Sequence, residues 1–440
     1  MAKDAQGHEL SEASGEAAQA LDEGMRAFTL SYGDVGAHLA RADQVSPGCM
    51  MAGVLRAWVL TLSNDPAQVA QARALVAELS GRKMNARERT HHAALELAAS
   101  GRWPSAVKLL DRHLMTYPHD LIAHQAALRL DGFLGRFHHA AGRSARALPF
   151  WSKEQPGYGI LLSFYGFGLE ETGDYAQAED VSRAAAEREP LGYWPHHAVS
   201  HVLEMTGRPR EGIAWMDERL PLWAGADNGN RVHIWWHKAL FHIELGQWSQ
   251  ALDLYDREIV PTLRPAGTSL CNATALLWRL ETLGIAPGDR WHSLFALWHD
   301  RANGSASAFN DIHYAMTALR ADETAAFDAL RAAMTQSAMG DGELARVYRD
   351  VGLPVIDAAA AMVHGAHGRA ADHLLPVRAD LWQMGGSKAQ RDLVEWTLLV
   401  AATRAGKRDV AVSLANERLA LRPHSAVNQH LLDEARAIVN

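Results

Sequence analysis

Apolar positions along the chain recur with the spacing of amphipathic helices, and a glycine-centred unit of two such helices repeats. In each copy a glycine follows one apolar-periodic segment, a short polar turn comes next, and a second apolar-periodic segment begins near an alanine. Neighbouring copies lie 34 residues apart from Gly173 to Gly207 and 39 residues apart from Gly207 to Gly246. The clear copies start at Gly101, Gly173, Gly207, Gly246 and Gly406, and a weaker one starts at Gly368.

The residues of this unit predict a stacked array of antiparallel helix pairs. Glycine tolerates the left-handed conformation that ends a helix, and the small alanine lets the second helix approach closely. Because one pair cannot bury its apolar face alone, neighbouring pairs must stack. A period near 34 residues is typical of tetratricopeptide repeats. We therefore predict an all-α fold with tetratricopeptide-like helical repeats forming a right-handed superhelix. Residues 1–150 would hold divergent N-terminal repeats, and residues 151–440 the superhelix with a histidine-rich pocket.

Composition limits the classes of partner. The formal net charge is −8 and is spread without blocks, so no basic stripe for phosphates is present and we expect no nucleic-acid partner. No run of about 18 apolar residues occurs, and the first 13 residues lack the pattern of a secretory leader, so we expect no membrane association. Two cysteines, Cys49 and Cys271, fit a reducing compartment. The sequence thus predicts a cytoplasmic protein.

Histidines one helical turn apart form the most informative pattern. At about 100° per residue, His197, His201 and Glu204 lie on one face of a predicted helix. His233 and His237 repeat the same spacing in the next unit, 36 residues after the first pair. Because consecutive units stack, we expect all four imidazoles to face a shared hollow. Trp194 and Trp236, beside these histidines, would help to wall off water and bind a substrate.

Paired histidines can hold a divalent transition metal ion, with a carboxylate such as Glu204 or Asp311 completing the site, or can transfer protons as general acids and bases. Histidines of a repeat groove can also serve only as hydrogen-bonded groove residues. The sequence leaves both possibilities open.

Two further polar clusters are candidates for the same pocket. Asn310, Asp311 and His313 lie near the start of another predicted helix, where Asn310 or Asp311 would otherwise serve as a helix cap. In the run G-G-S-K-A-Q-R-D, Ser387 and Gln390 have the spacing of a capping box, and Arg391 is placed to bind an anion. We expect Asp311 and His313 to act in catalysis, and Asn310, Gln390 and Arg391 to bind substrate.

Taken as a set, these motifs resemble the tetratricopeptide-repeat protein 38 family, which includes bacterial StaR-like proteins. The resemblance rests on H-x-x-x-H-x-x-E from His197, H-x-x-W-H from His233, F-N-D-x-H from Phe309 and G-G-S-x-A-Q-R-D from Gly385. It covers roughly residues 150 to 435. It implies a repeat fold without an assigned activity. The His-Asp pair often found in that family after a P-x-D turn is missing after Pro118-His-Asp120.

Two functions therefore compete. In the first, a small polar molecule binds in the pocket and is hydrolysed, or exchanges a proton, with the four histidines acting as metal ligands or acid-base groups. In the second, the repeats form a non-catalytic scaffold whose groove binds a peptide or another protein. The expected partner is accordingly a small molecule or a peptide, and assembly into a homo-oligomer is left open.

Overall fold

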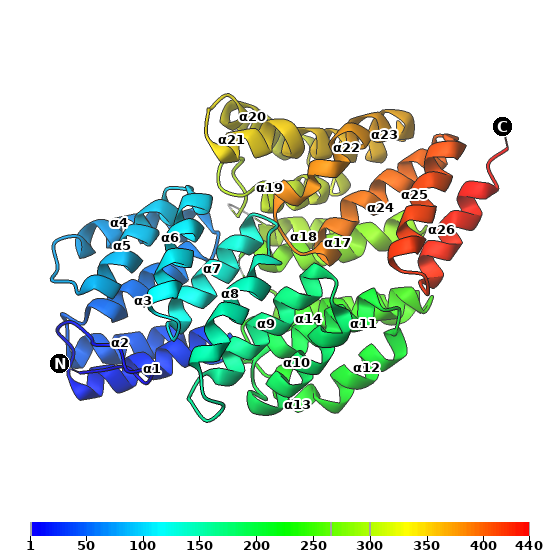
Figure 1. Ribbon diagram of the computed structural model, residues 1–440. Coiled ribbons are helices and arrows are strands. Elements are labelled where there is room, and N and C mark those ends of the chain that lie inside the picture. Colours follow the sequence, from blue (N-terminus) through cyan, green and yellow to red (C-terminus); the bar gives the residue numbers. More distant parts are fainter. Residues whose placement is uncertain (1, 265, 299–300, 440) are drawn as a thin grey trace. The chain divides into compact units, whose positions relative to one another are not determined.

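The computed structural model describes residues 2–264, 266–298 and 301–439, and it is built of helices (Figure 1). Two isolated bridges, Lys3–Glu9 and Tyr32–Asn228, are the β-type pairings recorded in these ranges. The prediction of an all-α fold with tetratricopeptide-like repeats is confirmed. None of the helices in the described ranges has the length and apolar character needed to cross a bilayer.

Contacts divide the chain into two compact units, Met1–Val199 with Arg219–Arg231, and Ser200–Glu218 with Val232–Asn440. The sequence was divided at residue 150 because the repeats before that point are divergent. This division stays a prediction. The first unit contains α1 (Gly15–Leu30), α2 (Val35–Val45), α3 (Met50–Thr61), α4 (Pro66–Leu79), α5 (Ala86–Ala99), α6 (Trp103–Thr116), α7 (Leu121–Phe133), α8 (His139–Ala147), η1 (Leu148–Phe150), α9 (Tyr158–Thr172), α10 (Tyr175–Arg188) and the short α13 (Leu220–Trp223).

α11 (Tyr193–Met205) runs without interruption from the first unit into the second. The second unit continues with α12 (Pro209–Glu218), α14 (Arg231–Glu244), α15 (Trp248–Leu254), η2 (Tyr255–Ile259), α16 (Val260–Thr262), α17 (Gly267–Thr282), α18 (Arg290–Trp298), α19 (Ala308–Arg320), α20 (Thr324–Ala338), α21 (Glu343–Val347), η3 (Tyr348–Gly352), α22 (Leu353–Val363), α23 (His367–Leu374), η4 (Leu375–Met384), α24 (Lys388–Arg404), α25 (Arg408–Leu421) and α26 (Ala426–Arg436).

Helices that follow one another in sequence pack as pairs within each unit. In the first unit α1 packs on α2, α3 on α4, α5 on α6 and α9 on α10; in the second, α22 packs on α23 and α25 on α26 (Figure 1). The repeat glycines end the first helix of a pair as predicted, for example Gly207 and Gly246 with φ of 67° and 69°. The weak copy is shifted: the left-handed glycine is Gly365, whereas Gly368 lies inside α23.

Local sequence signals also explain where the helices near the site begin. Ser387 caps α24, and Gln390 completes the predicted capping box. The expectation that Asn310 or Asp311 caps α19 is wrong, because Ser307 accepts the hydrogen bond from the backbone N–H of Asn310. Each unit has its own apolar core, with Trp58 and Phe167 fully buried in the first and Trp236 and Trp298 in the second.

Candidate metal centre

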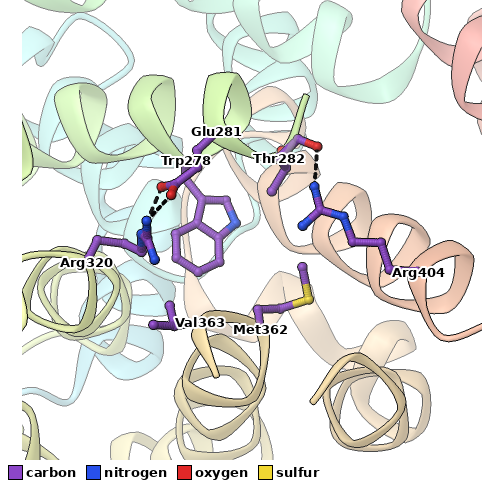
Figure 2. Close-up of a pocket in the computed structure, with 7 residues that line it drawn as sticks. All are labelled: Trp278, Glu281, Thr282, Arg320, Met362, Val363 and Arg404. Carbon is purple, nitrogen blue, oxygen red and sulfur yellow. Dashed lines mark hydrogen bonds and ion pairs between the residues drawn. The ribbon is translucent and has the colours of Figure 1, made fainter. Parts of the chain in front are cut away.

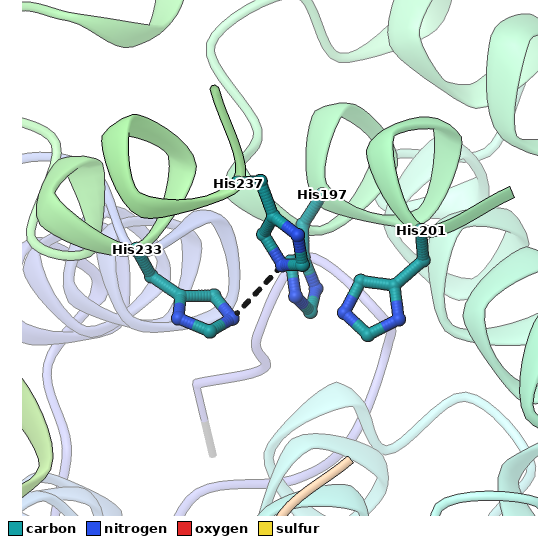
Figure 3. Close-up of side chains that lie close together, drawn as sticks. All are labelled: His197, His201, His233 and His237. Atoms are coloured by element: carbon teal, nitrogen blue, oxygen red, sulfur yellow. Dashed lines mark hydrogen bonds between the residues drawn. The ribbon is translucent and has the colours of Figure 1, made fainter. Parts of the chain in front are cut away.

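Four imidazoles project from α11 and α14 toward one space (Figure 3). His201, His233 and His237 belong to the second unit, and His197 lies one turn before His201 on the continuous helix α11. Each of the four offers a ring nitrogen, and these nitrogens lie within 4.8 Å of one another. All four side chains are buried. The convergence predicted from the one-repeat spacing is what the structure shows.

Hydrogen bonds fix which nitrogen of His233 carries its proton. The Nδ2 of Asn272 donates to the carbonyls of Thr268 and Ser269, so the Oδ1 of Asn272 is its acceptor end. That Oδ1 lies 2.6 Å from the Nδ1 of His233. His233 must therefore donate through Nδ1–H, which leaves a lone pair on its Nε2.

His237 is oriented in the same way by a carboxylate. Its Nδ1 lies 3.0 Å from Oε2 of Glu204 and donates to it. When Glu204 is ionised, the Nε2 of neutral His237 is an acceptor, and it faces the Nε2 of His233 at 3.3 Å. The two Nε2 atoms thus face each other in a buried space.

Aromatic and ionic contacts surround the pair. The ring of Trp236 stacks on His233 with centroids 5.1 Å apart and an interplanar angle of 16°. The ring of His201 lies 4.6 Å from that of His237, centroid to centroid. Burial lowers the pKa of His237 well below its usual range, and the neighbouring His201, His233 and Arg279 lower it further. A protonated His237 is therefore strongly disfavoured at neutral pH.

A network of buried charges lies behind Glu204. The guanidinium of Arg422 lies 3.7 Å from Glu204 and 2.6 Å from Asp392. Arg418 binds Asp392 at 2.8 Å, and Arg279 lies 3.8 Å from it. Burial raises the pKa of Glu204, and Arg422 opposes this rise. Glu244 also acts on Arg422, and Glu395 lies near Arg418, so the three guanidiniums face four carboxylates and these groups carry no excess positive charge.

Arg279 has the longest ion-pair distance of the three guanidiniums. It is almost fully buried; its Nη2 donates to the carbonyl of Ala389 at 2.9 Å, and its guanidinium lies 5.5 Å from the ring centroid of Trp236. Burial lowers its pKa to about 10, although Asp392 and Glu204 oppose the shift.

The remaining predicted site residues have structural partners. The carboxylate of Asp311 accepts hydrogen bonds from the backbone N–H groups of Asn303 and Gly304, both at 3.1 Å, and from the hydroxyl of Tyr348 at 2.6 Å. Burial raises the pKa of Asp311 to about 6, and these hydrogen bonds oppose the rise. Asp311 therefore anchors the loop before α19. Asn310 accepts a hydrogen bond from the thiol of Cys271 at 3.6 Å.

The other predicted site residues also form hydrogen bonds within the protein. The Nδ1 of His313 lies 2.7 Å from the carbonyl of Phe309, and burial lowers its pKa to about 4. Trp194 lies in the core of the first unit, where its indole N–H donates to Gln125 at 3.1 Å. Gln390 belongs to the capping box, and Arg391 donates to the carbonyl of Gly386. Catalytic and substrate-binding roles for these residues stay predictions.

A second buried histidine group, in the first unit, has a different character. The Oδ2 of Asp120 lies 2.9 Å from the Nε2 of His91 and 3.1 Å from the Nε2 of His113, and it also accepts from Arg87. The indole N–H of Trp58 donates to the Nδ1 of His91 at 3.1 Å, so His91 donates to Asp120 through Nε2–H. The nitrogens that face Asp120 therefore carry protons that they donate to its carboxylate, and we assign this network a structural role.

Sequence reasoning missed the residues that orient the histidines. Asn272 and Arg279 lie on α17, far from the histidines in sequence, and no spacing marks them. Arg418 and Arg422 stand one turn apart on α25, a spacing that does indicate a shared face. Asp392 was part of the G-G-S-K-A-Q-R-D motif, but its partners could not be predicted from it.

No family model matches the chain. Among solved structures, the human IFIT1 dimer with m7Gppp-AAAA aligns over 95% of this chain and 94% of that chain, at 13% identity and a TM-score of 0.42. The APC/C hetero-tetramer Cut9–Hcn1 aligns over 96% of this chain and 90% of that chain, at 13% identity and a TM-score of 0.33. These values carry no argument about the function of this chain.

Proposed function

We propose that the protein binds a divalent transition metal ion through His201, His233 and His237, with His197 as the fourth nitrogen ligand. The observation that carries the proposal is the convergence of ring nitrogens from four buried histidines, which lie within 4.8 Å of one another. Nitrogens at this spacing suit one shared metal ion. A proton would place an imidazolium in a buried space, which is costly, whereas a metal ion uses the nitrogen lone pairs.

The distances support this proposal. Zinc binds histidine nitrogen at about 2.0–2.1 Å, and two ligands at a tetrahedral angle are then about 3.3 Å apart. Metal-bound histidines commonly donate their other ring N–H to a carboxylate or a carbonyl oxygen. Glu204 and Asn272 accept these hydrogen bonds from His237 and His233.

We further propose that a small polar molecule with a negative charge binds beside this centre and is hydrolysed there. Arg279 supports the choice of an anion, because its buried guanidinium lies 3.8 Å from Asp392, whereas Arg418 and Arg422 lie within 2.8 Å of that carboxylate. A metal ion with an open position lowers the pKa of bound water to about 7, which would supply the nucleophile. The motifs that resemble the tetratricopeptide-repeat protein 38 family include the two histidine pairs of this centre.

The metal claim is tested with the full chain, stripped of metal and titrated with Zn²⁺ against a chromophoric chelator. His201→Ala and His237→Ala are expected to weaken binding by at least tenfold each. His242→Ala is the matched control, because His242 lies on the same helix as His237 but bonds Gln247 instead. Equal affinity of wild type and both cluster variants would overturn the claim.

The hydrolytic claim needs a separate readout. Zinc-loaded protein is expected to turn over chromogenic carboxylate- or phosphate-bearing esters, and His237→Ala is expected to abolish the turnover. If the protein binds zinc but hydrolyses none of these esters, the hydrolytic claim fails and the metal claim stands. If neither zinc nor a small anion binds, a protein-binding scaffold is the function that remains.

A further inference from the structure

A separate cavity of about 110 Å³ opens in the second unit between α17, α19, α22 and α24 (Figure 2). Its lining comes from Trp278, Glu281, Thr282, Arg320, Met362, Val363 and Arg404. None of these residues belongs to the histidine centre or to its charge network. Figure 2 shows the Trp278 indole between two arginines, with the apolar side chains of α22 opposite.

The two arginines differ in how their charges are balanced. Glu281 holds Arg320 through both carboxylate oxygens, with one contact of 2.9 Å, and also accepts from the indole N–H of Trp291 at 3.0 Å. Arg404 donates through Nη2 to the backbone carbonyl of Thr282 at 2.8 Å. Within the described part of the chain, no carboxylate forms an ion pair with Arg404. The cavity therefore carries one uncompensated positive charge.

The rest of the lining combines the Arg320–Glu281 ion pair and Thr282 with three apolar side chains. The indole of Trp278 is 3% exposed, and its N–H is already committed to the hydroxyl of Thr397 at 2.9 Å, so it offers the cavity only its hydrocarbon surface. Met362 and Val363 form the facing wall. A ligand in this cavity meets a flat apolar surface on one side and a guanidinium at the rim.

We propose that this cavity binds a small monocarboxylate whose body is a single ring or a comparably compact apolar group. The carboxylate pairs with Arg404, for which guanidinium geometry is well suited, and the ring lies between Trp278 and Met362. This cavity, at about 110 Å³, is smaller than the cavity of about 150 Å³ known to hold benzene, so a body larger than one ring does not fit. A second negative charge would approach Glu281 and is disfavoured.

The experiment uses the full chain and measures the binding of benzoate by calorimetry and ligand-observed NMR. Benzoate is expected to bind in the millimolar range, at least tenfold more tightly than neutral benzamide or dianionic phthalate. Arg404→Gln is expected to weaken benzoate binding at least tenfold. Arg408→Gln, on the neighbouring helix α25 and outside the lining, is the matched control and is expected to leave it unchanged.

A second variant removes the apolar space without touching the charge. Met362→Trp is expected to fill the cavity and abolish benzoate binding while Arg404 stays in place. The proposal is overturned if benzoate does not bind up to about 10 mM, beyond the range expected for so small a ligand, or if benzamide binds equally well. It is also overturned if a peptide with a C-terminal phenylalanine binds more tightly than benzoate, because the cavity would then be a site for a protein terminus.

Discussion

Removing the carboxylate of Glu204 is the sharpest perturbation of the histidine centre that leaves every proposed ligand intact. Glu204 accepts a hydrogen bond from the Nδ1 of His237 at 3.0 Å and forms an ion pair with it when that histidine is protonated. Its loss frees His237 to rotate and lowers the basicity of its Nε2.

The expected size of the effect follows from the role of such partners. Loss of a carboxylate that orients a metal-bound histidine costs about 10- to 100-fold in metal affinity, or roughly 1.4 to 2.7 kcal/mol. Glu204→Ala should therefore weaken Zn²⁺ binding by this factor. Glu204→Gln should lose less, because the amide oxygen still accepts from Nδ1–H. Arg422 keeps Asp392 as a partner at 2.6 Å in both variants, so folding should be preserved.

The assay is the chelator competition titration, carried out on wild type and both variants at one pH and one salt concentration. Glu244→Ala serves as the control, because Glu244 also acts electrostatically on Arg422 but stands at the end of α14, where its carboxylate accepts from the backbone N–H of Val427 at 3.3 Å. Glu204→Ala binding zinc as tightly as wild type would refute the reasoning. A loss of similar size in Glu244→Ala would also refute it, since the effect would then not depend on His237.

Three further predictions concern the structural roles assigned above and the expectation, from net charge, of no nucleic-acid partner. Asp311→Asn should leave the loop before α19 anchored, because the amide can accept from the two backbone N–H groups and donate to Tyr348. The raised pKa of Asp311 means that the folded state loses stability relative to the unfolded state as pH rises from about 4 to about 6. The variant should therefore be more stable than wild type above about pH 6, by at most roughly 3 kcal/mol, and urea unfolding at pH 5 and pH 7.5 measures this; a loss of stability at pH 7.5 would contradict it. Asp120→Ala should cost less than the roughly 3–5 kcal/mol of a fully unpaired buried charge, because Arg87 loses Asp120 but keeps Asp4 at 2.9 Å, and zinc stoichiometry should not change; a lost zinc equivalent would show that the first-unit histidines bind metal. The net charge of −8 predicts no binding of a capped RNA oligonucleotide beyond the roughly micromolar range of non-specific contacts, and filter binding with a tighter Kd would reject this expectation.

The repeat fold could be predicted because its determinants are local. Glycines at helix ends, caps such as Ser387 and apolar spacing all act within a few residues, so Gly207 and Gly246 marked the helix pairs correctly. The weak copy failed because two glycines, Gly365 and Gly368, stand three residues apart, and only their backbone geometry decides which one ends the helix.

The candidate site could be predicted only where the repeat itself places residues side by side. His201 and His237 occupy equivalent positions in consecutive helix pairs, so their spacing alone predicted that they lie close together. Asn272 and Arg279 come from α17 and reach the site through tertiary packing, which no spacing reveals. Asp311 was predicted to act in catalysis because the sequence does not reveal its hydrogen-bond partners. These are the backbone N–H groups of Asn303 and Gly304 and the hydroxyl of Tyr348.

The central claim is that imidazoles of α11 and α14 bind one metal ion. The most direct measurement is a crystal structure of zinc-soaked protein with data collected on both sides of the zinc absorption edge. The account predicts one anomalous peak at about 2.0–2.1 Å from the Nε2 atoms of both His233 and His237, with the Nδ1–H groups still bound to Asn272 and Glu204. The absence of any peak among the four rings, or zinc bound only at surface residues, would contradict it.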